Sequence, residues 1–478
     1  MAVADVVVLA ATAIVPYVAS PYDVRALLVA LPANMRSGPL AALLTLLQSP
    51  AAFLEQWPVV CLEDVALRYR PLALLALPVL PSIVIRRFRD LPIVGRRELV
   101  AFLTAWPITS IQVSNDDDGD WDVDLFAAAL PRCARLAHIG VSISMFARLR
   151  RWLPPSVRRV TLARDPWDST VDYTDAVDMT PLLTWPQTAT LTHLCLDCVG
   201  YFENALVANA LATAPSLQCL DLRSMELDGS DIVALVDVLV AAKMTLPHVT
   251  ELRLDGVDEL SVAKLLSLID GRRLTRLDVH YGENLSFLIA LLPTLPALET
   301  LCFGYGMLDF LPAPTAHKCL RHVSFDTFML ATEDVSLLLD WTCGLSRLER
   351  ISFCNFTLGE GPRASMQRAL CHWFNRASVT YVRLERCDLD EDAAADVASA
   401  LSSRTSPLAL DLVQNGLLGQ REVRCLFDAL APLPTSTLRA SIVAEHRDEI
   451  VSYARQRGLM VDDSGDGEYT FCSVGRVL

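Results

Sequence analysis

Four residues of types that bind zinc occur as two closely spaced pairs, His193 with Cys195 and Cys219 with Asp221. Residues two apart on a β-strand point to the same face of a sheet. If the two segments form neighbouring strands, the four side chains occupy the corners of one square. Side chains on one sheet face run parallel, however, and do not converge on a tetrahedral centre. The only CxxC, at Cys195 and Cys198, has no second pair. We therefore expect neither a metal nor a cofactor.

A second group of residues is typical of interfaces between proteins. Aromatic and arginine side chains supply many of the anchors of protein interfaces. The candidate partner-binding residues are His280, Tyr281, Tyr305, His322, Arg350, Tyr381, Arg383 and Arg386. The alternative interpretation is an ordinary polar surface, and the pattern alone does not decide between the two.

Both groups lie in an internal repeat, which predicts the elements that position them. Apolar residues recur three, five, eight and ten residues after a starting residue, as in the stretch VTYVRLERCDL at residues 379–389. Nine such starts lie 22 to 32 residues apart, at Leu191, Leu217, Val249, Leu274, Leu298, Leu320, Leu348, Val379 and Pro407. The segments between them carry apolar residues at three- and four-residue spacing and open on Asp, Glu, Ser or Pro, which predicts amphipathic helices.

This pattern resembles the leucine-rich repeat, and its length of about 27 residues resembles the ribonuclease-inhibitor-like type. The resemblance covers residues 187–440. It implies an α/β fold: a leucine-rich repeat solenoid with a curved parallel sheet on the concave side, helices on the convex side and a small helical N-terminal cap. The candidate partner-binding residues would then lie on or beside the concave face. Cys387 takes the place that Asn415 fills one repeat later, and we expect it to be buried scaffold.

Residues 56–186 contain weaker copies of the motif. Strands are predicted near Trp57, Leu80, Ile108, Leu136 and Val157, which would give about fourteen repeats with acidic inserts at 115–124 and 163–186. The first insert fails as a calcium loop, because Ser114 and Leu125 stand where the loop needs acidic residues. The predicted divisions are a helical cap or degenerate F-box-like segment (1–55), degenerate repeats (56–186), regular repeats (187–440) and a C-terminal cap and tail (441–478).

The N-terminal segment resembles the opening of an F-box, in which an apolar helix is followed by a Pro-Tyr-Asp turn. The matching residues, with Asp23 as a helix cap, are Val7, Ile14, Val18, Pro21, Asp23, Val24, Leu27 and Leu31. The usual Leu-Pro start is missing, and Pro16 interrupts the first helix. A cap that shields the first repeat would need the same apolar pattern, so both interpretations stand. The F-box resemblance implies that residues 1–40 contact a Skp-type adaptor.

The composition argues against several kinds of partner and cellular location. The chain has 41 basic and 56 acidic residues. Of these, 24 basic and 38 acidic residues follow residue 186, which gives this part of the chain a net charge of −14. Nucleic acid needs a basic surface, and we expect no nucleic-acid partner. The apolar stretches are too short for a membrane span, and no basic residue precedes the first of them as in a signal peptide. Thirteen scattered cysteines do not form a disulfide framework. We expect a cytoplasmic or nuclear protein.

The chain contains no nucleophile elbow, phosphate-binding loop, zincin histidine pair or set of kinase motifs. We therefore do not expect the protein to be an enzyme. The sequence favours a non-enzymatic protein-protein interaction scaffold that binds a protein partner on the concave face. With the F-box resemblance, it would be the substrate-recognition subunit of a cullin-RING ubiquitin ligase. The alternative is an inhibitor or GTPase-activating regulator of another enzyme.

Overall fold

The computed structural model divides the chain into two compact units, unit 1 (Met1–Met225) and unit 2 (Glu226–Leu478). The predicted bounds at 55, 186 and 440 remain predictions. In the part of the chain that the structure describes, no helix has the length and apolar character needed to cross a membrane. The described residues are 10–11, 14–15, 21–48, 59–61, 65, 67–80, 82–85, 108–112, 123–163, 178–185, 188–197, 202–223, 230–280, 285–304, 317–326, 332–355, 363–376, 378–387, 391–402, 404–412, 415, 420–433, 435–441, 444–463 and 468–473.

Unit 1 contains a parallel sheet in which consecutive strands along the chain are also neighbours. Each strand falls where the sequence predicted one. The strands are β1 (Val59–Cys61), β2 (Ser82–Ile85), β3 (Ile108–Gln112), β4 (His138–Ser142), β5 (Arg159–Ala163), β6 (His193–Asp197) and β7 (Cys219–Arg223).

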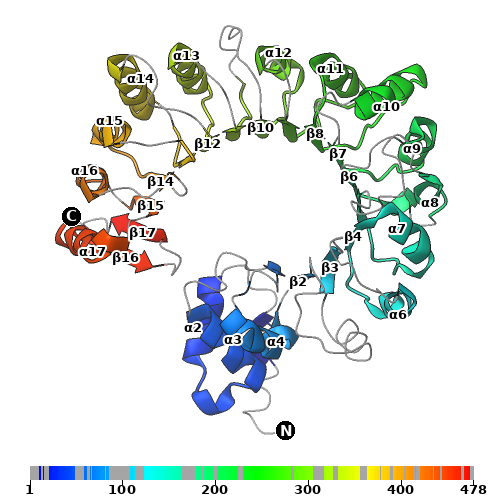
Figure 1. Ribbon diagram of the computed structural model, residues 1–478, viewed down its shortest axis with the longest axis horizontal. Coiled ribbons are helices and arrows are strands. Elements are labelled where there is room, and N and C mark those ends of the chain that lie inside the picture. The colour runs from blue at the N-terminus through cyan, green and yellow to red at the C-terminus, as the bar shows by residue number, and fades with distance from the viewer. Residues whose placement is uncertain are drawn as a thin grey trace. The chain divides into compact units, whose positions relative to one another are not determined.

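The helices of unit 1 precede or connect these strands (Figure 1). In α2, Val24 and Leu28 are fully buried, whereas Val29 is 53% exposed. Asp23 lies in the first turn of α2 and not at the cap as predicted, because the helix begins at Pro21. The helices are α2 (Pro21–Ala30), α3 (Gly38–Gln48), α4 (Arg70–Ala76), α6 (Val123–Ala129), α7 (Ile143–Leu149), α8 (Thr180–Leu183) and α9 (Asn204–Ala212).

Unit 2 has the same arrangement of parallel strands, but its last strands pair antiparallel. Strands β8 to β15 are parallel and follow the chain order, whereas β17 pairs antiparallel with both β15 and β16. The strands are β8 (Glu251–Asp255), β9 (Arg276–His280), β10 (Thr300–Gly304), β11 (His322–Asp326), β12 (Arg350–Cys354), β13 (Tyr381–Glu385), β14 (Ala409–Leu412), β15 (Thr437–Ser441), β16 (Leu459–Asp463) and β17 (Glu468–Ser473).

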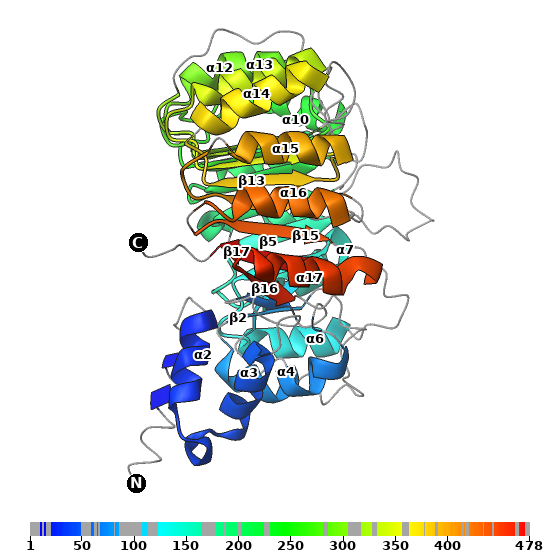
Figure 2. The same cartoon turned by 90° about the vertical axis from the view of Figure 1, so that its left-hand side faces the viewer.

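The helices of unit 2 lie on the outer side of the arc that its strands form (Figure 1). Figure 2 shows α15 and α16 running side by side along this outer surface. The Asp258 carboxylate caps α11 by accepting a hydrogen bond of 3.0 Å from the backbone of Ser261. The helices are α10 (Ser230–Ala241), α11 (Glu259–Ser267), α12 (Leu285–Leu291), α13 (Thr332–Cys343), α14 (Arg363–Arg376), α15 (Glu391–Ser402), α16 (Gln420–Leu430) and α17 (Arg447–Gln456).

The core of unit 2 lies between strands and helices, and it consists of residues that repeat from strand to strand. The second and fourth residues of the parallel strands β8 to β15 point inward, as Val382 and Leu384 do in β13. Phe303, Phe325 and Phe353 occupy the fourth position of adjacent strands and stack with ring centroids 6.0 and 5.5 Å apart. Aromatic stacking adds to the free energy of burying these rings, so each repeat stabilises its neighbours.

The turn after β13 confirms that Cys387 is scaffold. Its side chain is fully buried, and the thiol donates to the carbonyl of Phe353 over 3.3 Å. The Asn415 side chain accepts from the Cys387 backbone over 2.5 Å and donates to the carbonyls of Leu384 and Leu412. Buried backbone groups need such partners, so the asparagine joins the turns of two successive repeats.

These observations confirm the predicted fold class, a leucine-rich repeat solenoid with helices ahead of the first strand. One repeat was missed. The parallel strand β15 lies beyond the last predicted motif, because Ala440 stands where the motif has leucine and Thr435 takes the place of the first apolar residue. Leu438 and Ala440 of this strand are nevertheless buried.

Candidate protein-binding surface

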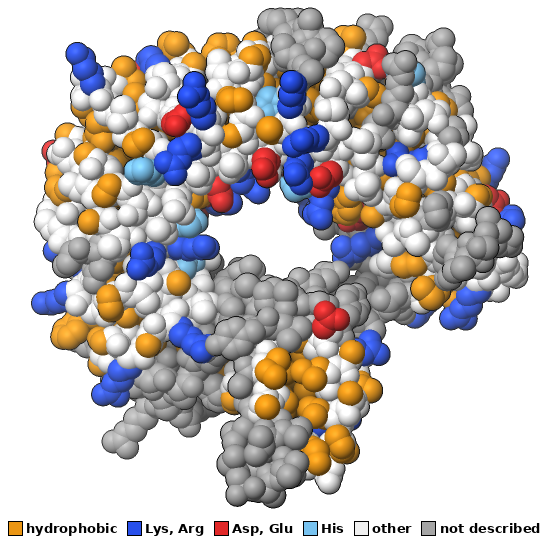
Figure 3. All heavy atoms as spheres, turned by 180° about the vertical axis from the view of Figure 1, so that it is seen from behind, with side chains coloured by type: hydrophobic (Ala, Val, Ile, Leu, Met, Phe, Trp, Pro, Cys, Tyr) orange, Lys and Arg blue, Asp and Glu red, His pale blue; other side chains and the backbone are white. Residues whose placement is uncertain are grey.

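The first and third residues of strands β8 to β15, with the fifth residue of every strand except the four-residue β14, form one continuous surface, which we call the strand face of unit 2. In β13 the burial alternates, with Tyr381, Arg383 and Glu385 partly exposed between buried neighbours. Adjacent strands pair residue for residue, so that side chains at the same position form rows across the strands. Figure 3 shows basic and acidic side chains interspersed along the inner edge of the arc.

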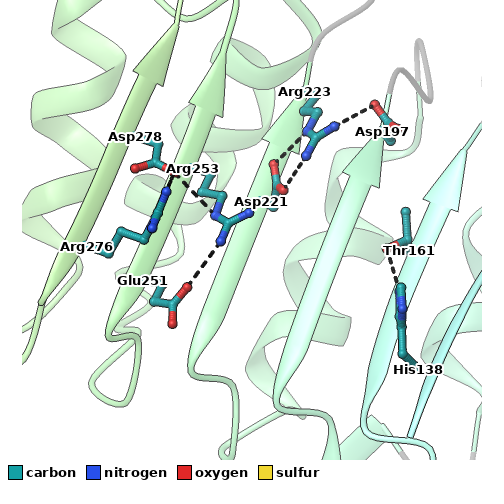
Figure 4. Close-up of polar contacts among 9 residues, drawn as sticks. All are labelled: His138, Thr161, Asp197, Asp221, Arg223, Glu251, Arg253, Arg276 and Asp278. Carbon is teal, nitrogen blue, oxygen red and sulfur yellow. Dashed lines mark hydrogen bonds and ion pairs between the residues drawn. The ribbon is translucent and has the colours of Figure 1, made fainter. Parts of the chain in front are cut away.

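Arginines and carboxylates on β8 and β9 form a set of ion pairs in which only the Asp278 carboxylate is buried (Figure 4). The Asp278 side chain is 8% exposed and accepts from Arg276 over 2.9 Å. Nε of Arg253 lies 3.4 Å from the same oxygen, and both arginine side chains are 37% exposed. Glu251, at 36% exposure, lies 3.5 Å from Arg253. A partner would therefore meet guanidinium groups with a carboxylate held beneath them.

The same layering occurs on β13 to β15. The Asp411 side chain is 8% exposed and lies 4.0 Å from Arg439, and it accepts a hydrogen bond of 3.0 Å from the Tyr381 hydroxyl. Glu385 is 16% exposed and accepts from Arg383 over 2.7 Å. Both carboxylates stand at positions of the strand pattern that face away from the core, yet Asp278 and Asp411 are buried because the longer arginine and tyrosine side chains cover them.

Small residues occupy the middle of the strand face, between the two sets of ion pairs. Cys302, Ser324 and Ser352 share the third-position row of β10 to β12. Gly304 leaves room for the ring of His280, because a Cβ atom there would lie 2.3 Å from Nδ1 of that histidine. Burial, followed by the neighbouring Asp278 carboxylate, raises the pKa of the Cys302 thiol to about 12. The thiol is therefore protonated near neutral pH and presents a small, neutral surface.

His322, Arg350 and Tyr381 lie side by side in the first-position row of β11, β12 and β13. The guanidinium carbon of Arg350 lies 5.7 Å from the centre of the Tyr381 ring, a cation–π contact. Burial and then the charge of Arg350 lower the pKa of His322. Burial, followed by the Asp411 carboxylate, raises the pKa of Tyr381 to about 12. The row therefore presents one fixed positive charge flanked by two neutral rings near pH 7.

The structure brings together part of the predicted partner-binding group. His280, His322, Arg350, Tyr381 and Arg383 lie on the strand face. Arg386 follows β13 in an exposed position with a positive φ of 51°. Tyr281 and Tyr305 lie outside the described residues. Whether the group binds a partner remains a prediction.

The predicted square of possible metal ligands in unit 1 does exist, because β6 pairs His193 with Cys219 and Cys195 with Asp221. Its side chains are held by other groups. Arg223 makes two hydrogen bonds of 3.1 and 3.0 Å to Asp221 (Figure 4). Burial, followed by the charge of Asp221, raises the pKa of the Cys195 thiol far above its usual value. In the described parts of the chain, no three His, Cys, Asp or Glu side chains are placed to hold a metal ion.

A histidine network in unit 1 was missed from the sequence. His138 of β4 lies between two hydroxyl groups. Its Nδ1 lies 2.7 Å from Ser110 Oγ, and its Nε2 lies 3.0 Å from Thr161 Oγ1 (Figure 4). Burial first, then the charges of Arg159 and His193, lower the pKa of His138 to about 4. The histidine is therefore neutral at pH 7. The sequence could have indicated this network, because Ser110, His138 and Thr161 all lie in the predicted strands.

No family model and no curated protein matches the sequence. Solved structures with a similar fold include the leucine-rich repeat-containing protein LegL7 from Legionella pneumophila, at 14% identity and a TM-score of 0.38 over 67% of this chain and 97% of that one. A chain of the yeast Rad7 and Elc1 complex is 11% identical, with a TM-score of 0.36 over 91% and 88% of the two chains. Human 5T4 is 17% identical, with a TM-score of 0.30 over 48% and 82%. These low scores add nothing about function.

Proposed function

We propose that the protein is a non-enzymatic scaffold that binds a protein partner on the strand face of unit 2. One observation carries this proposal: each of eight consecutive parallel strands places a polar side chain on this face, and at both ends of the face arginines lie above more deeply buried carboxylates. Such a surface offers many hydrogen-bond donors in fixed positions, which suits the polar contacts of a protein interface. Tyr381 and Arg350 are of the residue types that contribute most binding energy in such interfaces.

Site-specific photocrosslinking in cells tests the scaffold function. A photoreactive amino acid replaces Ser352 on the strand face of the full chain, and the matched control replaces Ser399, which is exposed on α15. We expect the Ser352 position to crosslink a discrete protein that the Ser399 position does not. Equal crosslinking from both positions, or none from Ser352, would contradict the proposal.

We further propose that the bound protein is a substrate and that the N-terminal helices contact a Skp-type adaptor of a cullin-RING ubiquitin ligase. The F-box resemblance supports this role, and so does α2, which exposes Val29 while Val24 and Leu28 face inward. An apolar side chain exposed beside other apolar residues marks a contact surface. Ile14, at 52% exposure, and Leu75, at 50%, are further exposed apolar residues of this N-terminal part, where Figure 3 shows apolar side chains together.

The adaptor contact is tested by Val29→Asp, with Val240→Asp on α10, 37% exposed, as the matched control. Wild type and V240D are expected to copurify with the Skp-type adaptor, whereas V29D loses it. If wild type recovers no adaptor, or V29D retains it, the ligase role is wrong. If the partner crosslinked at Ser352 is an enzyme or GTPase whose activity the protein changes, the regulator alternative replaces it.

A further inference from the structure

We propose that Arg350 binds a carboxylate in an acidic segment of the protein partner. This inference rests on the scaffold function above and adds the chemistry of the partner. Arg350 differs from the other arginines of the strand face: Arg253, Arg276, Arg383 and Arg439 each lie within 4.0 Å of a carboxylate. In the described parts of the chain, no carboxylate lies within that distance of Arg350, and its side chain is exposed.

The unpaired charge of Arg350 limits which partner surface can bind over it. A partner that buries Arg350 removes water from the charge, and a buried charge without a counter-charge or a hydrogen-bond acceptor is strongly unfavourable. The covering surface must therefore supply an acceptor, and a carboxylate matches the planar fork of arginine with two parallel hydrogen bonds. The paired arginines need no such group, since their own carboxylates already compensate them.

Arg350 is also held ready for such a contact. The buried Asp411 carboxylate fixes the Tyr381 hydroxyl over 3.0 Å, and the guanidinium of Arg350 lies over the ring that this bond orients. This contact limits the motion of the guanidinium. Less conformational entropy is then lost on binding, which strengthens the complex.

The surroundings favour a protein carboxylate over the phosphates of a nucleic acid. Arg350 stands in the first-position row, whereas the acidic side chains Asp326 and Glu385 stand in the fifth, roughly 13 Å away at 3.3 Å per residue. A polyanion that follows the strands from Arg350 would place its next charges against these acids. A peptide can present one carboxylate to Arg350 and uncharged groups to Ser324 and Ser352.

The test is selection of a displayed library of random 12-residue peptides on the full chain, followed by affinity measurements with the enriched peptides. We expect peptides enriched in Asp or Glu, with binding weakened about tenfold or more by Arg350→Gln. Arg350→Lys, which keeps the charge but loses the fork, and Tyr381→Phe, which keeps the ring but loses the Asp411 bond, should each cost less. Arg455→Gln, at an exposed arginine on α17, is the matched control and should bind like wild type.

Several results would overturn the inference: no enriched peptide, peptides without acidic residues, or equal binding by wild type and R350Q. Tighter binding of a phosphopeptide or of a 12-nucleotide RNA than of the acidic peptides would assign the site to phosphate instead. Because Arg350 is exposed, R350Q should fold, which its circular dichroism spectrum checks. If Ser352 crosslinks a protein but Arg350 proves irrelevant to binding, the scaffold function stands and only this inference falls.

Discussion

Asp278 is predicted to hold the first two strands of the arc together, and Asp278→Asn tests this role. The substitution keeps the shape of the side chain and removes its charge. Arg276 on the same strand and Arg253 on β8 then lose their shared carboxylate. Because strands lie about 4.8 Å apart, the two guanidinium groups also repel each other once the carboxylate is gone.

The magnitude follows from the exposure of the groups. A hydrogen bond to a charged group contributes about 1.5–3 kcal/mol when buried, whereas an exposed ion pair contributes about 0.2–1 kcal/mol. The carboxylate is 8% exposed and the arginines are 37% exposed, so each contact lies between these limits. Asparagine retains one acceptor. We therefore expect D278N to lower the free energy of unfolding by about 1–3 kcal/mol.

Urea unfolding and amide hydrogen exchange of β8 to β10 measure this loss. Exchange matters because repeats are stabilised mainly by their neighbours and can open locally. Asp237→Asn is the matched control, because Asp237 pairs with Lys264 over 2.6 Å but is 57% exposed. Its effect should be small and should vanish at 1 M salt, where charges are screened within about 3 Å. Wild-type exchange and an unchanged urea midpoint in D278N would refute the stabilising role.

Four further predictions concern stability and reactivity. The pKa of His138 is lowered to about 4 in the folded chain, so the unfolded chain binds this proton more readily. The free energy of unfolding should therefore fall by on the order of 3 kcal/mol as the pH drops from about 6.5 to 4. His138→Gln should remove this pH dependence, as urea unfolding at several pH values would show. Asn415→Ala removes the side-chain hydrogen bonds of three buried backbone groups and should cost about 2–4 kcal/mol, whereas Asn415→Asp should differ from it if the amide donor matters. Arg404→Met removes four hydrogen bonds to backbone carbonyls from a residue that is 6% exposed and should cost about 2–4 kcal/mol in the same assay, while R455M should cost nothing measurable. Cys302, with a pKa raised to about 12, should resist iodoacetamide at pH 8 in the folded chain and react after unfolding, as mass spectrometry of its peptide would show.

The repeat period explains why the strands could be predicted from the sequence. A residue such as Leu384 must be apolar because it faces the core in every copy, so the spacing survives even where the copies are weak, as at Val157. The strand β15 escaped because its core positions tolerate Ala440 in place of leucine at the end of the repeat array. Positions that carry a period are visible from one sequence, whereas a single substituted repeat is not.

The composition of the strand face could be predicted, but its layering could not. The spacing places Asp278 and Arg276 on the same face, yet it does not determine which of the two covers the other. That depends on side-chain length and rotamer, which lie outside any period. The arginine side chain extends over the shorter aspartate and stays partly exposed to solvent, while the carboxylate is buried.

The same reasoning separates Arg350 from the arginines around it. From the sequence, Arg350 and Arg383 look equivalent, since both stand at exposed positions of neighbouring repeats. In the structure, Glu385 lies on the same strand two residues beyond Arg383 and pairs with it over 2.7 Å, whereas the residue two beyond Arg350 is Ser352, which has no charge. Arg350 is therefore available to a partner because β12 supplies no acid and, in the described residues, no neighbouring strand brings one within 4.0 Å. An aspartate introduced by Ser352→Asp should pair with Arg350 and weaken the binding of the acidic ligand, as R350Q does.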